Sequence, residues 1–153
     1  MKIRNILILI FTLLILTACS DKNNEDLVDD FLTVYFNQAN YSETEWQKIE
    51  ENIFSNNNDE AIEPFKEFFT DTALEKLTKS RVLPSFDLRD IELTYKLSGF
   101  EKFDDGLIAN LVLISNYKNI NCKLKFQFEN GKINWFDYTT LMKNTEQLKK
   151  QSV

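Results

Sequence analysis

The chain has 153 residues, which is the length of one ordinary domain, and its formal net charge at pH 7 is −6. An acidic chain binds nucleic acid poorly, because neutralising phosphates requires a basic surface. The sequence contains no histidine, which excludes histidine-based triads and imidazole metal ligands, and its two cysteines are too few for a cysteine-rich zinc site. We therefore expect no nucleic-acid partner, no metal and no other cofactor.

The first 18 residues have the pattern of an export signal. Lys2 and Arg4 form a short positive region, and residues 6–16 are apolar except for Thr12. A helix of that apolar length would be about 16 Å long, too short for a hydrocarbon core of about 30 Å. The segment over residues 1–18 is therefore predicted to be a signal peptide and not a membrane-spanning helix.

The signal ends in Leu16-Thr17-Ala18-Cys19, which resembles the lipobox of bacterial lipoproteins. The resemblance implies transfer of diacylglycerol to the Cys19 sulfur and cleavage before Cys19, with residues 19–25 forming the lipidated cysteine and a polar tether. Two or more acyl chains anchor a protein stably, so we expect it on the outer face of the cell membrane. The alternative is an ordinary secretory signal with an incidental cysteine. The many Asn, Lys and Ile residues suggest a low-GC Gram-positive bacterium.

Apolar residues recur with helical spacing between residues 26 and 81, which predicts three or four helices. The stripe of the first helix consists of Leu27, Val28, Phe31, Leu32, Tyr35 and Phe36. Ser42 and Glu45 form a capping box for a second helix, and Asp59 can cap a third. A second capping box, Thr72-Ala73-Leu74-Glu75, predicts a short helix that continues to about Arg81.

From about residue 90 the apolar period changes to two, which predicts four antiparallel strands. They are expected over residues 91–103, 107–116, 120–129 and 132–142. Asn130-Gly131 predicts a two-residue hairpin. A three-residue turn ending in Gly106 is favoured for the first hairpin, because a two-residue turn would mix the apolar and polar faces. Gly99 favours a kink or a bulge in the first strand, and the Lys-rich tail over residues 143–153 is expected to be solvated or frayed.

Helices followed by a four-stranded meander predict an α+β fold over residues 26–142, with the helices covering the concave face of a curved sheet. This order resembles the NTF2-like, or cystatin-like, cone fold, and residues 31–36 and 68–77 agree with it locally. The short N-terminal strand of many members has no evident counterpart. Small Gram-positive lipoproteins and domains of conjugation and type IV secretion machines often look like this. The resemblance implies a non-catalytic interaction module of an envelope, secretion or conjugation complex, or else small-molecule binding or sensing in the cone pocket.

The hairpin register places a carboxylate, Asp137, on the apolar face of the sheet. The expected pairs are Phe126 with Trp135, Leu124 with Asp137, and Cys122 with Thr139. Trp135, Thr139 and Tyr95 are then pocket candidates beside Asp137. Some NTF2-like enzymes use a pocket Asp as general base, which makes Asp137 a weak catalytic candidate for a hydrolase or isomerase. Alternatively, a bulge after Trp135 turns Asp137 outward, or Asp137 is hydrogen-bonded at the cone mouth.

The outer face of the sheet is expected to carry an apolar patch of Phe100, Ile108, Val112, Ile114, Phe136 and Tyr138. A contiguous patch would mark a protein-partner or homodimer surface, and many NTF2-like proteins associate through this face. The other interpretation is that the helices or the tail cover it. Cys122 is expected to be a small core residue rather than a redox group, and Asp104-Asp105 a turn rather than a calcium site.

Overall fold

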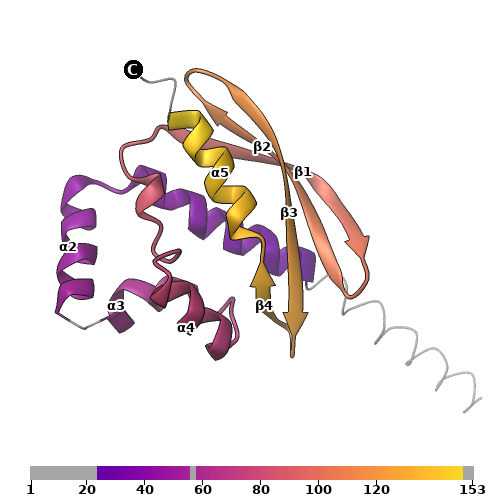
Figure 1. Cartoon of the computed structure of the whole chain (residues 1–153), viewed down its shortest axis with the longest axis horizontal. Helices are drawn as coiled ribbons and strands as arrows, with labels where there is room; N and C mark the ends of the chain where they lie inside the picture. The colour runs from indigo at the N-terminus through magenta and orange to yellow at the C-terminus, as the bar shows by residue number, and fades with distance from the viewer. Residues whose placement is uncertain (1–23, 56–57, 150–153) are drawn as a thin grey trace, which may run out of the picture.

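The computed structural model describes residues 24–55 and 58–149 of the chain. N-terminal helices are followed by a four-stranded antiparallel sheet and a C-terminal helix (Figure 1). This confirms the predicted α+β class, with the helices packed on one face of an antiparallel meander. The expected signal peptide and Cys19 lie outside the described residues.

The helical half begins with a helix over residues 24–37. It continues with η1 (Gln38–Asn40), α2 (Glu43–Phe54), α3 (Asn58–Ile62), η2 (Glu63–Phe65), α4 (Asp71–Lys79) and η3 (Phe86–Leu88). The predicted capping box of α2 is confirmed: Ser42 Oγ accepts the Glu45 N–H, and the Ser42 N–H donates to the Glu45 carboxylate at 2.6 Å. Asp59 lies in the first turn of α3.

The start of α4 differs from the prediction. Thr70, and not Thr72, is the N-cap, and its hydroxyl oxygen accepts the Ala73 N–H at 3.3 Å. The physical reason is a short strand-like contact just before the helix, where Phe69 forms a parallel bridge with Ile133. The Ile133 N–H donates to the Phe68 carbonyl and the Thr70 N–H donates to the Ile133 carbonyl. This pairing keeps the chain extended as far as Thr70.

The sheet has the order β1 (Leu93–Phe103), β2 (Gly106–Ser115), β3 (Asn119–Glu129) and β4 (Lys132–Phe136). The first hairpin turn has two residues, since Phe103 pairs with Gly106, so the expected three-residue turn was wrong. The predicted bulge at Gly99 is confirmed, because the register shifts between Leu97 and Gly99. The bulge adds one residue to β1 and so returns its following apolar side chains to the inner face of the sheet. For this reason the shorter turn does not mix the apolar and polar faces.

The C-terminal part of the sheet departs most from the prediction. A register shift between Gln127 and Phe128 leaves Asn134 as an extra residue in β4. Phe126 therefore pairs with Phe136 instead of Trp135, and the strand ends there. The expected pairs of Leu124 with Asp137 and of Cys122 with Thr139 do not form, because the chain has already turned into a helix.

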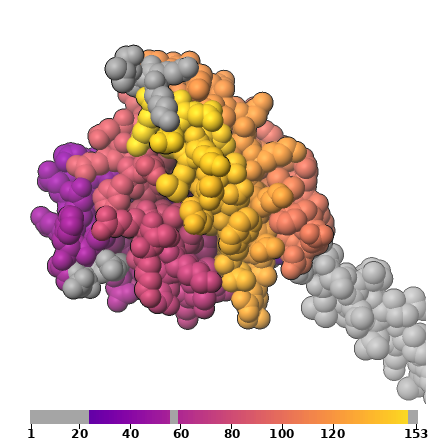
Figure 2. Space-filling view, viewed as in Figure 1, coloured from indigo at the N-terminus to yellow at the C-terminus, as the bar shows by residue number. Residues whose placement is uncertain are grey.

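That helix, α5 (Tyr138–Lys149), replaces the end of the expected fourth strand and most of the expected solvated tail. Leu141, Thr145 and Leu148 are buried on one face of it. The prediction of a Lys-rich solvated tail was therefore wrong for residues 143–149, while residues 150–153 lie outside the described part. Figure 2 shows α5 lying between the helical segments and the strands.

The core is a cluster of aromatic rings centred on Phe31. Its ring lies 5.0 Å from Phe69, 5.3 Å from Phe136 and 6.2 Å from Phe126, and these rings are at most 1 % exposed. All residues of the core cluster fall between Val28 and Leu148. Among the described residues, the chain from residue 20 onward therefore contains every member of this core cluster.

Candidate functional site

Asp137 serves as a helix cap in this structure. Its Oδ1 accepts the Thr140 N–H at 3.1 Å, and its Oδ2 accepts the Thr140 hydroxyl at 2.7 Å. Its own N–H donates to the Lys125 carbonyl. Both carboxylate oxygens are thus engaged at the start of α5, so placing Asp137 on the apolar face was wrong. The alternative of a bulge in β4 holds, although the extra residue precedes Trp135 instead of following it.

The other pocket candidates are not brought together with Asp137. Trp135 is 43 % exposed and borders a hollow of about 240 Å³ beside α4. Thr139 is exposed on α5. The Tyr95 hydroxyl lies 2.8 Å from the Thr33 hydroxyl, and partial burial raises the pKa of Tyr95. Among residues 24–55 and 58–149, these side chains belong to separate surfaces and do not line a common pocket with Asp137.

The expected patch on the outer sheet face is also corrected. Phe136 is 1 % exposed within the core, and Phe100 pairs with the fully buried Ala109 on the inner face. Tyr138 packs against the core from α5. The bulges in β1 and β4 cause this change, because each moves the following residues to the other face. Ile108, Val112 and Ile114 remain on the outer face, half-buried between polar neighbours such as Lys96 and Asn121, both paired with Val112.

Cys122 is buried as predicted, at 3 % exposure. Its thiol accepts a hydrogen bond from the Asn144 side chain at 3.1 Å, and burial raises its pKa. A raised pKa keeps the thiol protonated and poorly nucleophilic. The side chain therefore helps to hold α5 on β3.

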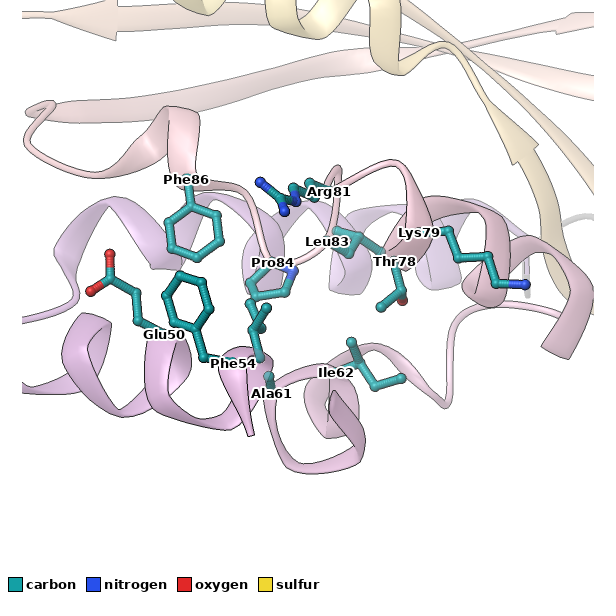
Figure 3. Close-up of a pocket in the computed structure, with 11 residues that line it drawn as sticks. Glu50, Phe54, Ala61, Ile62, Thr78, Lys79, Arg81, Leu83, Pro84 and Phe86 are labelled. Carbon is teal, nitrogen blue, oxygen red and sulfur yellow. The ribbon is translucent and has the colours of Figure 1, made fainter. Parts of the chain in front are cut away.

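A well-formed cavity with mainly apolar walls lies in the helical half. A cleft of about 400 Å³ separates α2 and α3 from α4 and the segment that follows it (Figure 3). Its walls are mainly apolar and include Ile53, Phe54, Ile62, Leu83, Pro84 and Phe86. Ligand sites usually have this size and this predominance of apolar walls.

One wall of the cleft is fixed by buried hydrogen bonds. Gln38, which is fully buried, donates to the Tyr35 carbonyl at 2.9 Å and accepts the Ser85 N–H at 2.8 Å. The Tyr35 hydroxyl donates to the Ser85 hydroxyl, and burial raises the pKa of Tyr35. These bonds attach residues 83–85, which carry Leu83 and Pro84 of the cleft wall, to the C-terminal end of the first helix.

The opposite wall is held mainly by polar contacts. Arg89 donates to Glu43 and to Glu50 of α2, both at 2.6 Å, so it connects α2 to the segment after η3. The ring of Trp46, the only fully buried aromatic side chain of α2, lies 5.4 Å from Phe86. Phe54, at the end of α2, is 82 % exposed although it borders the cleft.

Sequence analysis did not identify this cleft. Its residues come from α2, α3, α4 and a loop, and no spacing along the chain connects them. One signal was present: Phe54 follows Trp46 by eight residues in the apolar pattern of α2 and stands immediately before a polar loop.

In residues 24–55 and 58–149, no group of three or more Asp, Glu or Cys residues could hold a metal ion. No helix in this part of the chain is long and apolar enough to cross a bilayer. Comparison with known protein families, curated proteins and solved structures found no match to this chain.

Proposed function

We propose that this chain is a lipid-anchored, extracytoplasmic binding protein whose ligand site is the cleft between α2–α3 and α4. The observation that carries the proposal is the cleft itself, a cavity of about 400 Å³ with apolar walls and an aromatic side chain left 82 % exposed at its border. Exposed apolar surface beside a preformed cavity is typical of binding sites.

Two further observations support binding over catalysis and anchoring over release. The weak catalytic candidate, Asp137, uses both carboxylate oxygens to cap α5. The lipobox resemblance of Leu16-Thr17-Ala18-Cys19 supports anchoring through Cys19 on the outer face of the membrane. The likeness to NTF2-like domains is one of pattern, and it supports an interaction role without naming a partner.

The anchoring part is tested with the two cysteines of the chain as a matched pair. In a Gram-positive host fed an alkyne fatty acid, the wild-type chain and Cys122→Ser are expected to carry the label and to sediment with membranes. Cys19→Ser is expected to lose the label, because Cys122 is buried and cannot replace it as acceptor. A labelled Cys19→Ser variant would disprove lipidation at this residue.

The binding part is tested with a neutral fluorescent probe, N-phenyl-1-naphthylamine, and the chain from residue 20 onward. We expect saturable binding to the wild type and a loss of binding in Ile62→Trp, which fills the cleft. Ile108→Trp is the matched control, since Ile108 is also half-buried but lies on the outer sheet face. Equal binding by both variants, or none by the wild type, would contradict the cleft as the site.

A further inference from the structure

Some of the described charged side chains around the cleft already have an ion-pair partner, and one does not. Glu50 accepts a hydrogen bond from Arg89 at 2.6 Å, and Lys79 forms an ion pair with Glu75. Within the described residues, the Arg81 guanidinium has no carboxylate partner, although it borders the same cleft. One unneutralised cation therefore remains beside an apolar cavity in a chain whose net charge is −6.

The backbone conformation at Arg81 places the start of its exposed side chain beside the cleft. Arg81 has φ 58°, directly after the end of α4, and its N–H donates to the Thr78 carbonyl at 3.0 Å. Glycine or asparagine usually occupies such a left-handed position after a helix. Figure 3 shows the Arg81 side chain extending from this turn along the cleft, with its guanidinium directed toward Phe86.

We propose that the cleft binds a small amphipathic carboxylate, with its apolar body between the helices and its carboxylate on Arg81. This inference rests on the proposed function of the cleft and adds the chemical class of the ligand. A guanidinium presents two parallel N–H donors to a carboxylate, which a neutral polar group cannot match. The apolar walls bind the remainder of the molecule by removing it from water.

The fixed walls favour a small ligand over a protein segment. Gln38 and Ser85 hold the wall on the side of Leu83, and Arg89 holds α2 through two ion pairs. A cavity of about 400 Å³ is near the lower end of the range for small-molecule sites. A short or medium aliphatic chain with one charged end fits both the volume and the single cation.

The test compares three ligands with the same ten-carbon body: decanoate, decan-1-ol and decyltrimethylammonium. Decanoate and decyltrimethylammonium are titrated below their critical micelle concentrations, and decan-1-ol below its solubility limit, against N-phenyl-1-naphthylamine bound to the chain from residue 20 onward. Decanoate is expected to displace the probe at about tenfold lower concentration than decan-1-ol, because a hydrogen bond to a charged group adds roughly that factor. Decyltrimethylammonium is expected to be the weakest competitor.

Two charge variants test which side chain causes the preference for decanoate over decan-1-ol. Arg81→Gln is expected to remove the difference between decanoate and decan-1-ol, and its melting temperature is measured to show that the variant is folded. Lys79→Gln is the matched control, because Lys79 borders the same cleft but is already paired, and it is expected to keep the difference. Equal displacement by decanoate and decan-1-ol in the wild type would disprove the carboxylate and leave the cleft as a site for neutral ligands. If Arg81→Gln kept the preference for decanoate over decan-1-ol, Arg81 would not be the residue that binds the carboxylate, and the proposal would be overturned.

Discussion

The helix over residues 24–37 and α2 are both amphipathic, yet they contribute to the structure in different ways. The first helix buries Val28, Phe31, Leu32, Tyr35 and Phe36 in the core. α2 buries only Trp46, which packs against Phe86, and is also attached through the ion pairs of Arg89. Figure 1 shows α2 at the margin of the molecule, away from the strands.

The difference shows that an amphipathic pattern predicts a helix but not how completely its apolar face will be covered. The first helix faces the sheet, where Phe31 packs against Phe126 and Phe36 stacks on Tyr95. α2 faces other helices and a loop, which leave a cleft on one side and a smaller hollow, bordered by Gln38 and Pro64, on the other. Stability is therefore expected to reside in the aromatic core, and binding at the α2 side.

The most direct test of this difference in stability is to truncate one phenylalanine in the aromatic core and one on the α2 side. Phe31→Ala is expected to lower the free energy of unfolding by about 3–5 kcal/mol, because it leaves a cavity among packed rings. Phe54→Ala is expected to change it by less than about 0.5 kcal/mol, because this side chain is 82 % exposed. Guanidinium unfolding of the chain from residue 20 onward measures both.

Phe54→Ala, the variant with the smaller effect on stability, is expected to have the larger effect on ligand binding. Phe54→Ala is expected to lower the affinity for the fluorescent probe, since Phe54 borders the cleft. If Phe54→Ala were as destabilising as Phe31→Ala, the α2 side would belong to the folding core and the contrast would fail.

A second, smaller effect concerns the connection between the two regions. Gln38→Ala removes a buried amide that pairs with the Tyr35 carbonyl and the Ser85 N–H. Leaving such groups unsatisfied is expected to cost about 1–3 kcal/mol. Asn40→Ala, an exposed amide two residues away, is the control and should change stability by less than about 0.5 kcal/mol. Equal unfolding midpoints for the two variants would show that the network does not hold the cleft wall.

The smallest expected effect is a pH-dependent contribution of the α2 capping box to the stability of the protein. Hydrogen bonds from the Ser42 hydroxyl and the Ser42 N–H lower the pKa of the Glu45 carboxyl. A pKa lowered by folding stabilises the protein above the unfolded value of about 4.3, and this contribution is lost as the pH falls through the folded value. Glu45→Gln is therefore expected to be less stable than the wild type at pH 7.

This gap should close as the unfolding experiment is repeated below pH 4. Glu51→Gln, on the exposed surface of the same helix, serves as the control and is expected to show no comparable pH-dependent gap. A gap between Glu45→Gln and the wild type that persisted at low pH would mean that the carboxylate charge is not what the capping box uses.

The strands and the first helix could be predicted because local periodicity and core burial agree there. The Asn130-Gly131 hairpin also followed from sequence, since both residues have the positive φ that such a turn needs. The end of the sheet could not be predicted in the same way. Trp135, Phe136 and the threonines after Asp137 favour a strand locally, whereas the bulge at Asn134 and the cap at Asp137 end it.

The candidate site was less predictable than the fold for a physical reason. A cleft is space left between elements, and its shape depends on how far apart two helices pack, which no residue pattern encodes alone. Arg81 illustrates this: in sequence it is one cation at a helix end, and only the structure shows its backbone at φ 58° and its side chain beside the cavity.

The contact between Phe69 and Ile133 has a consequence for self-assembly. By occupying the outer edge of β4, it leaves β1 as the only sheet edge without a strand neighbour among the described residues. Filaments built by edge-to-edge pairing need two open edges on every copy, whereas a single open edge is used up once two copies have paired. Edge-to-edge pairing of the native sheet would therefore stop at two copies instead of continuing into a filament.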